Sequence, residues 1–247
     1  MNLFKIIIGV LYLCFLSAAS AQEKCQYKES DIEPLDEIIV LRSNGQPVEG
    51  MVCDYFENGK LRLETPYKDG KIEGISKSYY ENGKIERETP YNDGRKEGVQ
   101  KGYNEYGELR LETPYRYGKI DGIFKTYSET GELSWETPYK DGRMDGIEKW
   151  YYENGKVMEE IPFKNDKRDG IGRVYSESGK LKMETSYKNG RMGGYANIYN
   201  ETGQLLVKIL YKDDIPVSFV CEDGRQFTNA DLMKRQGKYE ALCKENP

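Results

Sequence analysis

Residues 74–97 read GISKSYYENGKIERETPYNDGRKE, and this stretch decides the fold. Two segments of alternating apolar and polar residues, 74–80 and 85–91, are separated by Glu-Asn-Gly-Lys, and Asn-Asp-Gly-Arg follows the second segment. Asn-Gly and Asp-Gly between alternating segments indicate tight hairpin turns, because these turns need a positive φ angle. The stretch therefore predicts two antiparallel strands and a return turn that leads to the next pair.

This pattern recurs every 24 residues with no insertion. Its first glycine appears seven times, as Gly50, Gly74, Gly98, Gly122, Gly146, Gly170 and Gly194. One aromatic residue follows in each strand, and these repeat-forming aromatics are Tyr55, Tyr67, Tyr79, Tyr91, Tyr103, Tyr115, Tyr127, Tyr139, Tyr151, Phe163, Tyr175, Tyr187, Tyr199 and Tyr211. A fixed period of this length is typical of repeat proteins. The sequence predicts an all-β fold, an elongated single-layer antiparallel β-sheet of tandem 24-residue hairpins.

The chain divides into four parts around this repeat. Residues 22–48 form an acidic, weakly periodic N-terminal cap, in which 38–41 is one expected strand. Residues 49–215 hold the seven repeats, and residues 216–247 form a C-terminal cap. Thr228 and Asp231 resemble a helix start, so a short helix is expected over 230–242.

Residues 1–21 have the features of a secretory signal peptide. Lys5 precedes an apolar run from Ile6 to Leu16, and Ala19-Ser20-Ala21 forms a cleavage site before Gln22. A transmembrane anchor is the alternative, but the run is shorter than the ~20 residues that span a bilayer. Cleavage would remove Lys5 and take the net charge from -5 to -6. We therefore expect export to the periplasm, the cell surface or the extracellular medium.

Four cysteines remain after that cleavage, two at each end of the repeats. An even number in an oxidising compartment favours disulfide bonds. Their placement predicts the pairs Cys25–Cys53 and Cys221–Cys243, one at each end. Free thiols are the alternative.

Strand alternation assigns side chains to faces. Leu109, Leu111, Thr113 and Tyr115 should share one face of the second strand, and stacked repeats should build one apolar-aromatic face. The opposite face is expected to carry a glutamate ladder: Glu64, Glu88, Glu112, Glu136, Glu160 and Glu184. A basic ladder is expected beside the first-strand aromatics: Lys77, Lys101, Lys125, Lys149 and Arg173. The glutamates can bind a metal or a basic partner, or be solvated and balanced by neighbouring Lys and Arg.

Composition excludes several function classes. The chain has no histidine, the commonest acid-base and metal-ligating residue. The net charge of -5 argues against nucleic-acid binding, which needs a basic surface. The chain also has no strongly basic amphipathic segment of the kind that binds membranes. The ladder carboxylates recur, whereas an active site is normally unique. We expect no enzyme activity, no catalytic residues, no cofactor and no metal.

The repeat unit resembles the MORN-repeat variant of bacterial proteins, often grouped as YwqK-like antitoxins. The resemblance is carried by Gly74-Ile75, Tyr79, 81–84, 88–91 and 93–95, and covers residues 49–215. It implies a sheet used for protein or membrane contacts, and the antitoxin label implies neutralisation of a toxin by binding.

Two binding hypotheses follow. In the first, the chain is an exported repeat scaffold for a protein partner, in the manner of an antitoxin or immunity protein. In the second, it is a structural or adhesive envelope protein that binds glycan or peptidoglycan, because aromatics such as Tyr127, Trp135 and Tyr139 can stack on sugars. The core-packing role of these aromatics is the simpler alternative.

Overall fold

The structure is a computed structural model that describes residues 25–234 and residue 243. The expected signal peptide and the expected helical residues 235–242 lie outside the described residues. The chain divides into two compact units, and each is described by itself. The first unit holds the residues up to 110 together with 115–118, and the second holds 111–114 and the residues from 119 onward.

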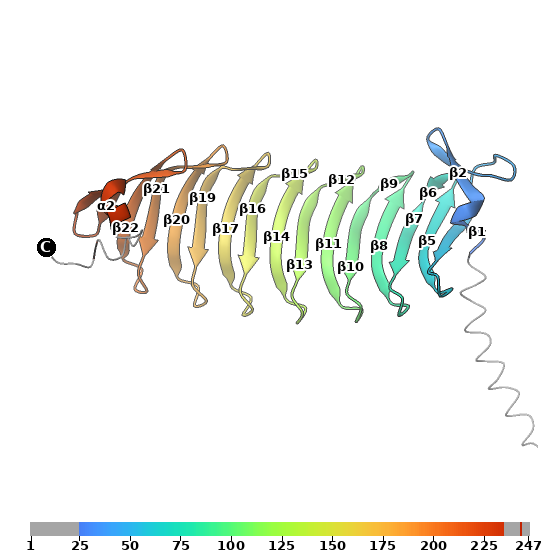
Figure 1. The fold of residues 1–247 in the computed structure, drawn as a ribbon, viewed down its shortest axis with the longest axis horizontal. Helices are drawn as coiled ribbons and strands as arrows, with labels where there is room; N and C mark the ends of the chain where they lie inside the picture. The colour runs from blue at the N-terminus through green and yellow to red at the C-terminus, as the bar shows by residue number, and fades with distance from the viewer. Residues whose placement is uncertain (1–24, 235–242, 244–247) are drawn as a thin grey trace, which may run out of the picture. The chain divides into compact units, whose positions relative to one another are not determined.

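The first unit contains the N-terminal cap and the first hairpins (Figure 1). Its elements are β1 (Tyr27–Lys28), the 3-10 helix η1 (Glu29–Asp31), β2 (Ile32–Leu35), β3 (Ile38–Leu41), β4 (Gly50–Tyr55), β5 (Leu61–Lys68), β6 (Lys71–Ile72), β7 (Gly74–Tyr79), β8 (Ile85–Asn92), β9 (Arg95–Lys96) and β10 (Gly98–Tyr103). Strand β11 (Leu109–Arg116) has residues in both units.

The second unit continues the same alternation of long and short strands and ends in a helix. Its elements are β12 (Lys119–Ile120), β13 (Gly122–Tyr127), β14 (Leu133–Lys140), β15 (Arg143–Met144), β16 (Gly146–Tyr151), β17 (Val157–Lys164), β18 (Lys167–Arg168), β19 (Gly170–Tyr175), β20 (Leu181–Lys188), β21 (Arg191–Tyr199), β22 (Leu205–Lys212), β23 (Ile215–Cys221), β24 (Gln226–Thr228) and α2 (Asn229–Lys234). The expected all-β fold of tandem 24-residue hairpins with a short C-terminal helix is confirmed.

Five hairpins, those that begin with β4, β7, β13, β16 and β19, pair a six-residue strand with an eight-residue strand and contain a β-bulge. In the hairpin of β16 and β17, Trp150 pairs with Glu159 but the next pair is Tyr151 with Val157. The residue between them, Met158, is therefore extra on its strand. A bulge of this kind shifts the alternation of faces by one residue, so Val157 joins the face of Tyr151.

The return turn between repeats is held by the acidic residue that precedes the repeat glycine. Asp141 and Gly142, the central residues of one such turn, have φ angles of 51° and 86°, as a type I′ turn requires. The side chain of Asp121 accepts a hydrogen bond of 3.2 Å from the backbone N–H of Asp141. Glu49, Glu73, Glu97 and Asp169 make the equivalent bond in other repeats. The acidic residue at this position thus has a structural role.

Proline sets the break between the short strand and the next long strand. Pro162 has no N–H to donate, and its carbonyl accepts the N–H of Asp169, the residue between β18 and β19. Gly170 follows with a φ of 125°, and a Cβ there would lie 2.9 Å from the Pro162 ring. At the equivalent of proline in the next repeat stands Ser186, and β21 runs unbroken over nine residues. A proline and a close-packed glycine therefore act together at each break.

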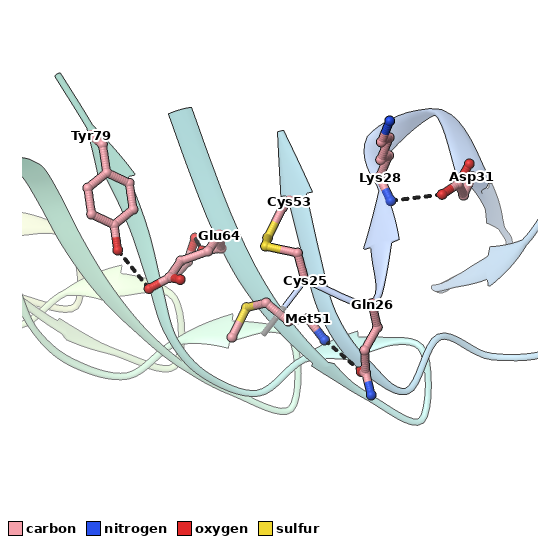
Figure 2. The surroundings of a disulfide bond; sticks show 9 residues. Cys25, Gln26, Lys28, Asp31, Met51, Cys53, Glu64 and Tyr79 are labelled. Carbon is pink, nitrogen blue, oxygen red and sulfur yellow. Dashed lines mark hydrogen bonds between the residues drawn. A yellow bond between two sulfur atoms is a disulfide. The ribbon is translucent and has the colours of Figure 1, made fainter. Parts of the chain in front are cut away.

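At the N-terminal end, a disulfide and a side-chain hydrogen bond attach the chain to the first hairpin (Figure 2). Cys25 is bonded to Cys53 on β4, and β1 pairs in parallel with β4. The side-chain oxygen of Gln26 accepts the N–H of Met51 at 3.1 Å. These contacts cover an edge strand that would otherwise expose unpaired backbone groups.

The C-terminal end of the second unit contains a buried hydrophobic cluster. Ala196, Val207, Ile209 and Phe219 are buried against one another. Phe227 and Cys243 pack on this cluster, and Cys243 is bonded to Cys221. Helix α2 packs against β23 and β24. The cap thus closes the last hairpins with apolar packing and a covalent bond.

Candidate ligand-binding face

The two faces of the sheet carry different side chains. The sequence-based assignment is right in placing the glutamate ladder opposite the second-strand aromatics, and wrong in placing the first-strand tyrosines with those aromatics. The first-strand tyrosines lie on the same face as the glutamate ladder, as the Tyr79–Glu64 hydrogen bond shows (Figure 2). The second-strand aromatics lie on the other face, with the buried threonines. There is no single apolar-aromatic face, because strand alternation places Tyr79 beside Lys77, which pairs with the ladder residue Glu88. We call the two faces the tyrosine face (Tyr79, Glu64 and their equivalents) and the threonine face (Thr89 and its equivalents).

On the tyrosine face, a tyrosine of one repeat donates to the ladder glutamate of the repeat before it. The bond is 2.7 Å from the hydroxyl of Tyr151 to Glu136. The same bond, at 2.8–3.0 Å, joins Tyr79 to Glu64, Tyr103 to Glu88, Tyr127 to Glu112, Tyr175 to Glu160 and Tyr199 to Glu184. Burial, the hydrogen bond to Glu112 and the charge of that residue raise the pKa of Tyr127 to about 12. The ladder therefore links successive repeats.

Basic side chains complete this network. Lys149 lies 3.5 Å from Glu136, and Arg173 donates to Glu184 at 3.1 Å. Lys77 lies 3.4 Å from Glu88. Three of the six ladder glutamates, Glu88, Glu136 and Glu184, thus have a neighbouring basic side chain. In the described ranges, no group of three or more acidic or cysteine side chains is arranged to hold a metal ion.

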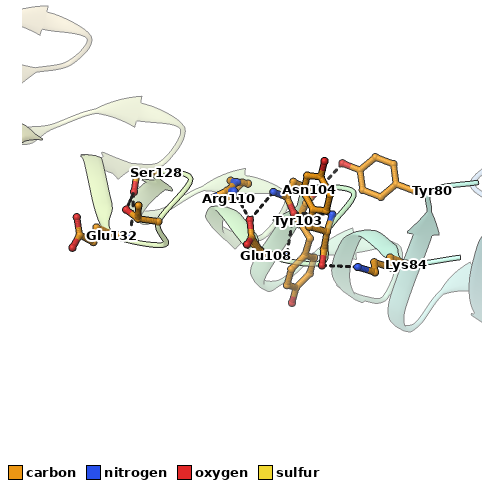
Figure 3. Close-up of polar contacts among 10 residues, drawn as sticks. Tyr80, Lys84, Tyr103, Asn104, Glu108, Arg110, Ser128 and Glu132 are labelled. Carbon is orange, nitrogen blue, oxygen red and sulfur yellow. Dashed lines mark hydrogen bonds and ion pairs between the residues drawn. The ribbon is translucent and has the colours of Figure 1, made fainter. Parts of the chain in front are cut away.

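The hairpin turns of neighbouring repeats are also bonded to one another. In the first unit, the hydroxyl of Tyr80 donates to the carbonyl of Tyr103, and Lys84 donates to the carbonyl of Tyr106 (Figure 3). Within a turn, Asn104 accepts the N–H of Glu108 at 3.0 Å. In the second unit Ser128 does the same for Glu132 at 3.2 Å (Figure 3). These polar residues thus stabilise their own turn or link it to the neighbouring one.

The threonine face of the second unit carries a cluster of aromatic rings. Trp135 on β14 and Trp150 on β16 pair directly, and their rings stack with centroids 4.8 Å apart and an angle of 6°. Phe124 meets the edge of Trp135 at 5.3 Å and lies 6.5 Å from Tyr139. The indole N–H of Trp135 is buried and has no hydrogen-bond partner among the described residues.

A buried carboxylate lies within this cluster. Glu148 is 7% exposed and accepts hydrogen bonds from Thr137 at 3.0 Å and from the indole N–H of Trp150 at 3.2 Å. A second carboxylate, that of the half-buried Glu159, lies directly opposite Trp150 on β17. Neither glutamate belongs to an ion pair in the part of the chain that the structure describes. This arrangement can attract a cation.

Of the aromatics proposed to stack on sugars, the structure brings Trp135 and Tyr139 together near Phe124. Tyr127 lies on the tyrosine face, bonded to Glu112. Trp150, Glu148 and Glu159 were not singled out from the sequence. A signal was available in the sequence, because the residues equivalent to Glu148 in the other repeats are Val52, Ser76, Gln100, Phe124, Gly172 and Ala196. Trp150, Glu148 and Glu159 therefore occupy positions that vary between repeats.

An exposed aliphatic row runs along the tyrosine face. In the second unit, Ile123, Ile147 and Ile171 follow the repeat glycine and are 46–49% exposed. Among the described residues, no helix is both long enough and apolar enough to cross a membrane.

The fold and faces define a tandem β-hairpin repeat scaffold. The family model of the MORN repeat variant matches residues 48–69, 72–93, 120–141, 144–165, 168–189 and 192–213. These segments make up more than half of the chain, so the chain belongs to the MORN repeat variant family. The repeat at 98–116 is not among them, although Gly98 and Gly107 keep positive φ angles of 105° and 82°.

Among solved structures, the chain is similar to the "Glycosylation Associate Protein (Gap123) complex from Streptococcus agalactiae". The two are 15% identical with a TM-score of 0.33, and the match covers 50% of this chain and 25% of that chain. The chain therefore spans about a quarter of that protein's length, and a likeness at this level carries no functional argument. A comparison with curated proteins gave no match.

Proposed function

We propose that the chain is an exported, non-enzymatic scaffold that binds a protein partner on the threonine face of its second unit. The difference between repeated and non-repeated residues carries the proposal. Repeated Tyr, Glu and Lys side chains bond to one another between hairpins. Trp135, Trp150 and Glu159 instead occupy positions that change from repeat to repeat. Repeat proteins use such surfaces for binding.

Export is supported by the two disulfides, Cys25–Cys53 and Cys221–Cys243. Disulfides persist in the periplasm and outside the cell, and are rare in the cytosol. The signal-like residues 1–21 agree with this location. Neutralisation of a toxin is the finer form of the proposal, and it rests on the resemblance to YwqK-like antitoxins.

An affinity pull-down with the mature chain, residues 22–247, from envelope and secreted fractions tests the proposal. We expect one protein to be enriched in stoichiometric amount, and its loss with the Trp150→Ser variant. Ile147→Ser is the matched control, because Ile147 is exposed on the same strand but on the other face. Recovery of no protein by the wild-type chain would contradict the proposal, and an enriched toxin would support its finer form.

A second candidate function, binding of an envelope glycan, is favoured by the stacked Trp135 and Trp150 rings. Co-sedimentation with purified peptidoglycan tests it. Retention of the wild-type chain, and its loss with Trp150→Ser, would support this candidate. No retention would reject it.

A further inference from the structure

Two rows of directly opposed side chains cross the threonine face of the second unit. One row, read from β13 to β22, is Thr126, Trp135, Trp150, Glu159, Val174, Met183, Ile198 and Val207. Glu159 is the charged residue of this row, and its neighbours are Trp150 on one side and Val174 on the other. A half-buried carboxylate between apolar side chains is partly desolvated, and a bound cation would stabilise it.

The neighbouring row contains Glu148, which pairs with Ile161. Glu148 and Glu159 are therefore diagonal neighbours on one face, where backbone positions are ~7 Å apart. Two like charges at this spacing repel each other. A cation bound between the indole and Glu159 would relieve the repulsion.

The tyrosine face shows how this chain treats carboxylates in a purely structural role. There every ladder glutamate accepts a tyrosine hydroxyl, and Glu136 and Glu184 also have the basic partners Lys149 and Arg173. Glu112 and Glu160 have the tyrosine and no ion pair among the described residues. Glu148 and Glu159 have no basic side chain of this chain in an ion pair, among the residues that the structure describes. What distinguishes Glu148 and Glu159 is that they lie beside an indole ring, where a basic group of a partner can approach both the ring and a carboxylate.

The chemistry of the cluster favours a guanidinium group over an ammonium group. The indole N–H of Trp150 donates to the Glu148 carboxylate, which polarises the ring and makes its face more attractive to a cation. Arginine is planar, stacks on aromatic rings and can bond both oxygens of a carboxylate at once. Val174 and Met183, beyond Glu159, offer apolar surface to its aliphatic part.

We infer that Trp150 and Glu159 bind an arginine side chain of the partner protein, with its guanidinium stacked on the indole and paired with the carboxylate. This inference rests on the proposed function and specifies the chemistry of the bound partner.

The chain offers a direct optical test, because Trp135 and Trp150 are its two tryptophans. The mature chain, residues 22–247, is titrated with blocked Gly-Arg-Gly peptide, and tryptophan fluorescence and the two indole N–H signals in NMR spectra are followed. We expect saturable changes, and binding about tenfold weaker for the matched citrulline peptide, which is the size of one partly desolvated cation–π contact. A lysine peptide should lie between them. Equal responses to arginine and citrulline peptides would overturn the inference.

Two variants locate the site in the same titration. Glu159→Gln should weaken the arginine peptide about tenfold and leave citrulline unchanged. Glu153→Gln removes one carboxylate from an exposed turn position and should change neither. Equal effects of the two variants would place the cation elsewhere. A response to N-acetylglucosamine oligosaccharides that Glu159→Gln does not alter, without an arginine response, would replace the inference by sugar stacking.

The pull-down separates this inference from the proposed function. Capture of a partner by the wild-type chain but not by Glu159→Gln would support both. Equal capture by the wild-type chain and Glu159→Gln would overturn the arginine site and leave the scaffold function standing. Capture of nothing by the wild-type chain would overturn the scaffold function, and the arginine site would then be judged by the peptide titration alone.

Discussion

The tyrosine face and the threonine face of the second unit are built from the same strands but differ in how they treat charge. On the tyrosine face, Glu136 is bonded to Tyr151 and Lys149. On the threonine face, Glu148 and Glu159 have aromatic and hydroxyl neighbours and no ion pair among the described residues. The difference shows that the carboxylates of the repeated face connect hairpins, whereas Glu148 and Glu159 do not.

The largest expected effect comes from a substitution at the break between a two-residue strand and the strand that follows it, where the repeat glycine packs against a proline ring. Gly146 has a φ of 131°, and a Cβ there would lie 2.6 Å from the Pro138 ring. Gly146→Ala should lower the free energy of unfolding by about 3 kcal/mol, from backbone strain and overpacking together. Urea unfolding followed by circular dichroism measures it.

Gly194→Ala is the control for this substitution. Its added Cβ would lie 3.6 Å from Ser186, so only the φ of 89° opposes it. We expect a loss of about 1 kcal/mol. Equal losses for the two variants would show that the proline contact has no energetic effect.

A matched pair of glutamate substitutions compares the faces directly. Glu136→Ala leaves the Tyr151 hydroxyl and Lys149 without their acceptor and should cost about 2 kcal/mol of unfolding free energy. Glu159→Ala removes a carboxylate that has no ion pair among the described residues, and should lower the unfolding free energy by less than about 0.5 kcal/mol or raise it. Thermal unfolding of both variants gives the comparison. A larger loss of unfolding free energy for Glu159→Ala would contradict the conclusion that Glu136, and not Glu159, stabilises the fold.

Removing single tyrosine hydroxyl groups should give a smaller difference in unfolding free energy between the two faces, again with the larger loss on the tyrosine face. Tyr151→Phe deletes a 2.7 Å hydrogen bond to a carboxylate and should cost about 1.5 kcal/mol. The hydroxyl of Tyr139, on the threonine face, has no hydrogen-bond partner among the described residues. Tyr139→Phe should therefore be nearly neutral in the same denaturant titration. Similar costs for the two variants would count against the tyrosine network.

Alkaline pH should weaken the tyrosine face gradually. Burial and Glu112 raise the pKa of Tyr127 from 10.0 to about 12, so its contribution to stability is present below pH 10.0. It is lost as the pH rises towards about 12, because the unfolded chain releases the proton first. Stability measured across this window should fall more steeply for the wild-type chain than for Tyr127→Phe. Parallel curves would show that Tyr127 does not contribute.

The repeat, the turn positions and the all-β fold follow from the sequence because glycine, proline and the 24-residue period are local signals. The faces do not, for two reasons. The pairing of Lys149 with Glu160, which places Tyr151 on the glutamate face, depends on the register between strands, and the bulge in the second strand moves Val157 to that same face. The binding cluster was missed for a different reason. A repeat is recognised from the residues that recur, and Glu148 and Trp150 recur in no other repeat.

The unbroken 24-residue period has a consequence for how this chain can evolve. Unequal recombination between identical-length units adds or removes whole hairpins and leaves every Tyr–Glu bond with a partner. Trp135 belongs to one repeat, and Trp150 and Glu159 belong to the next. Gain or loss of a unit elsewhere would therefore change the length of the scaffold and preserve the cluster. Recombination at the junction between these two repeats would separate its tryptophans, so selection for binding should act most strongly against events there.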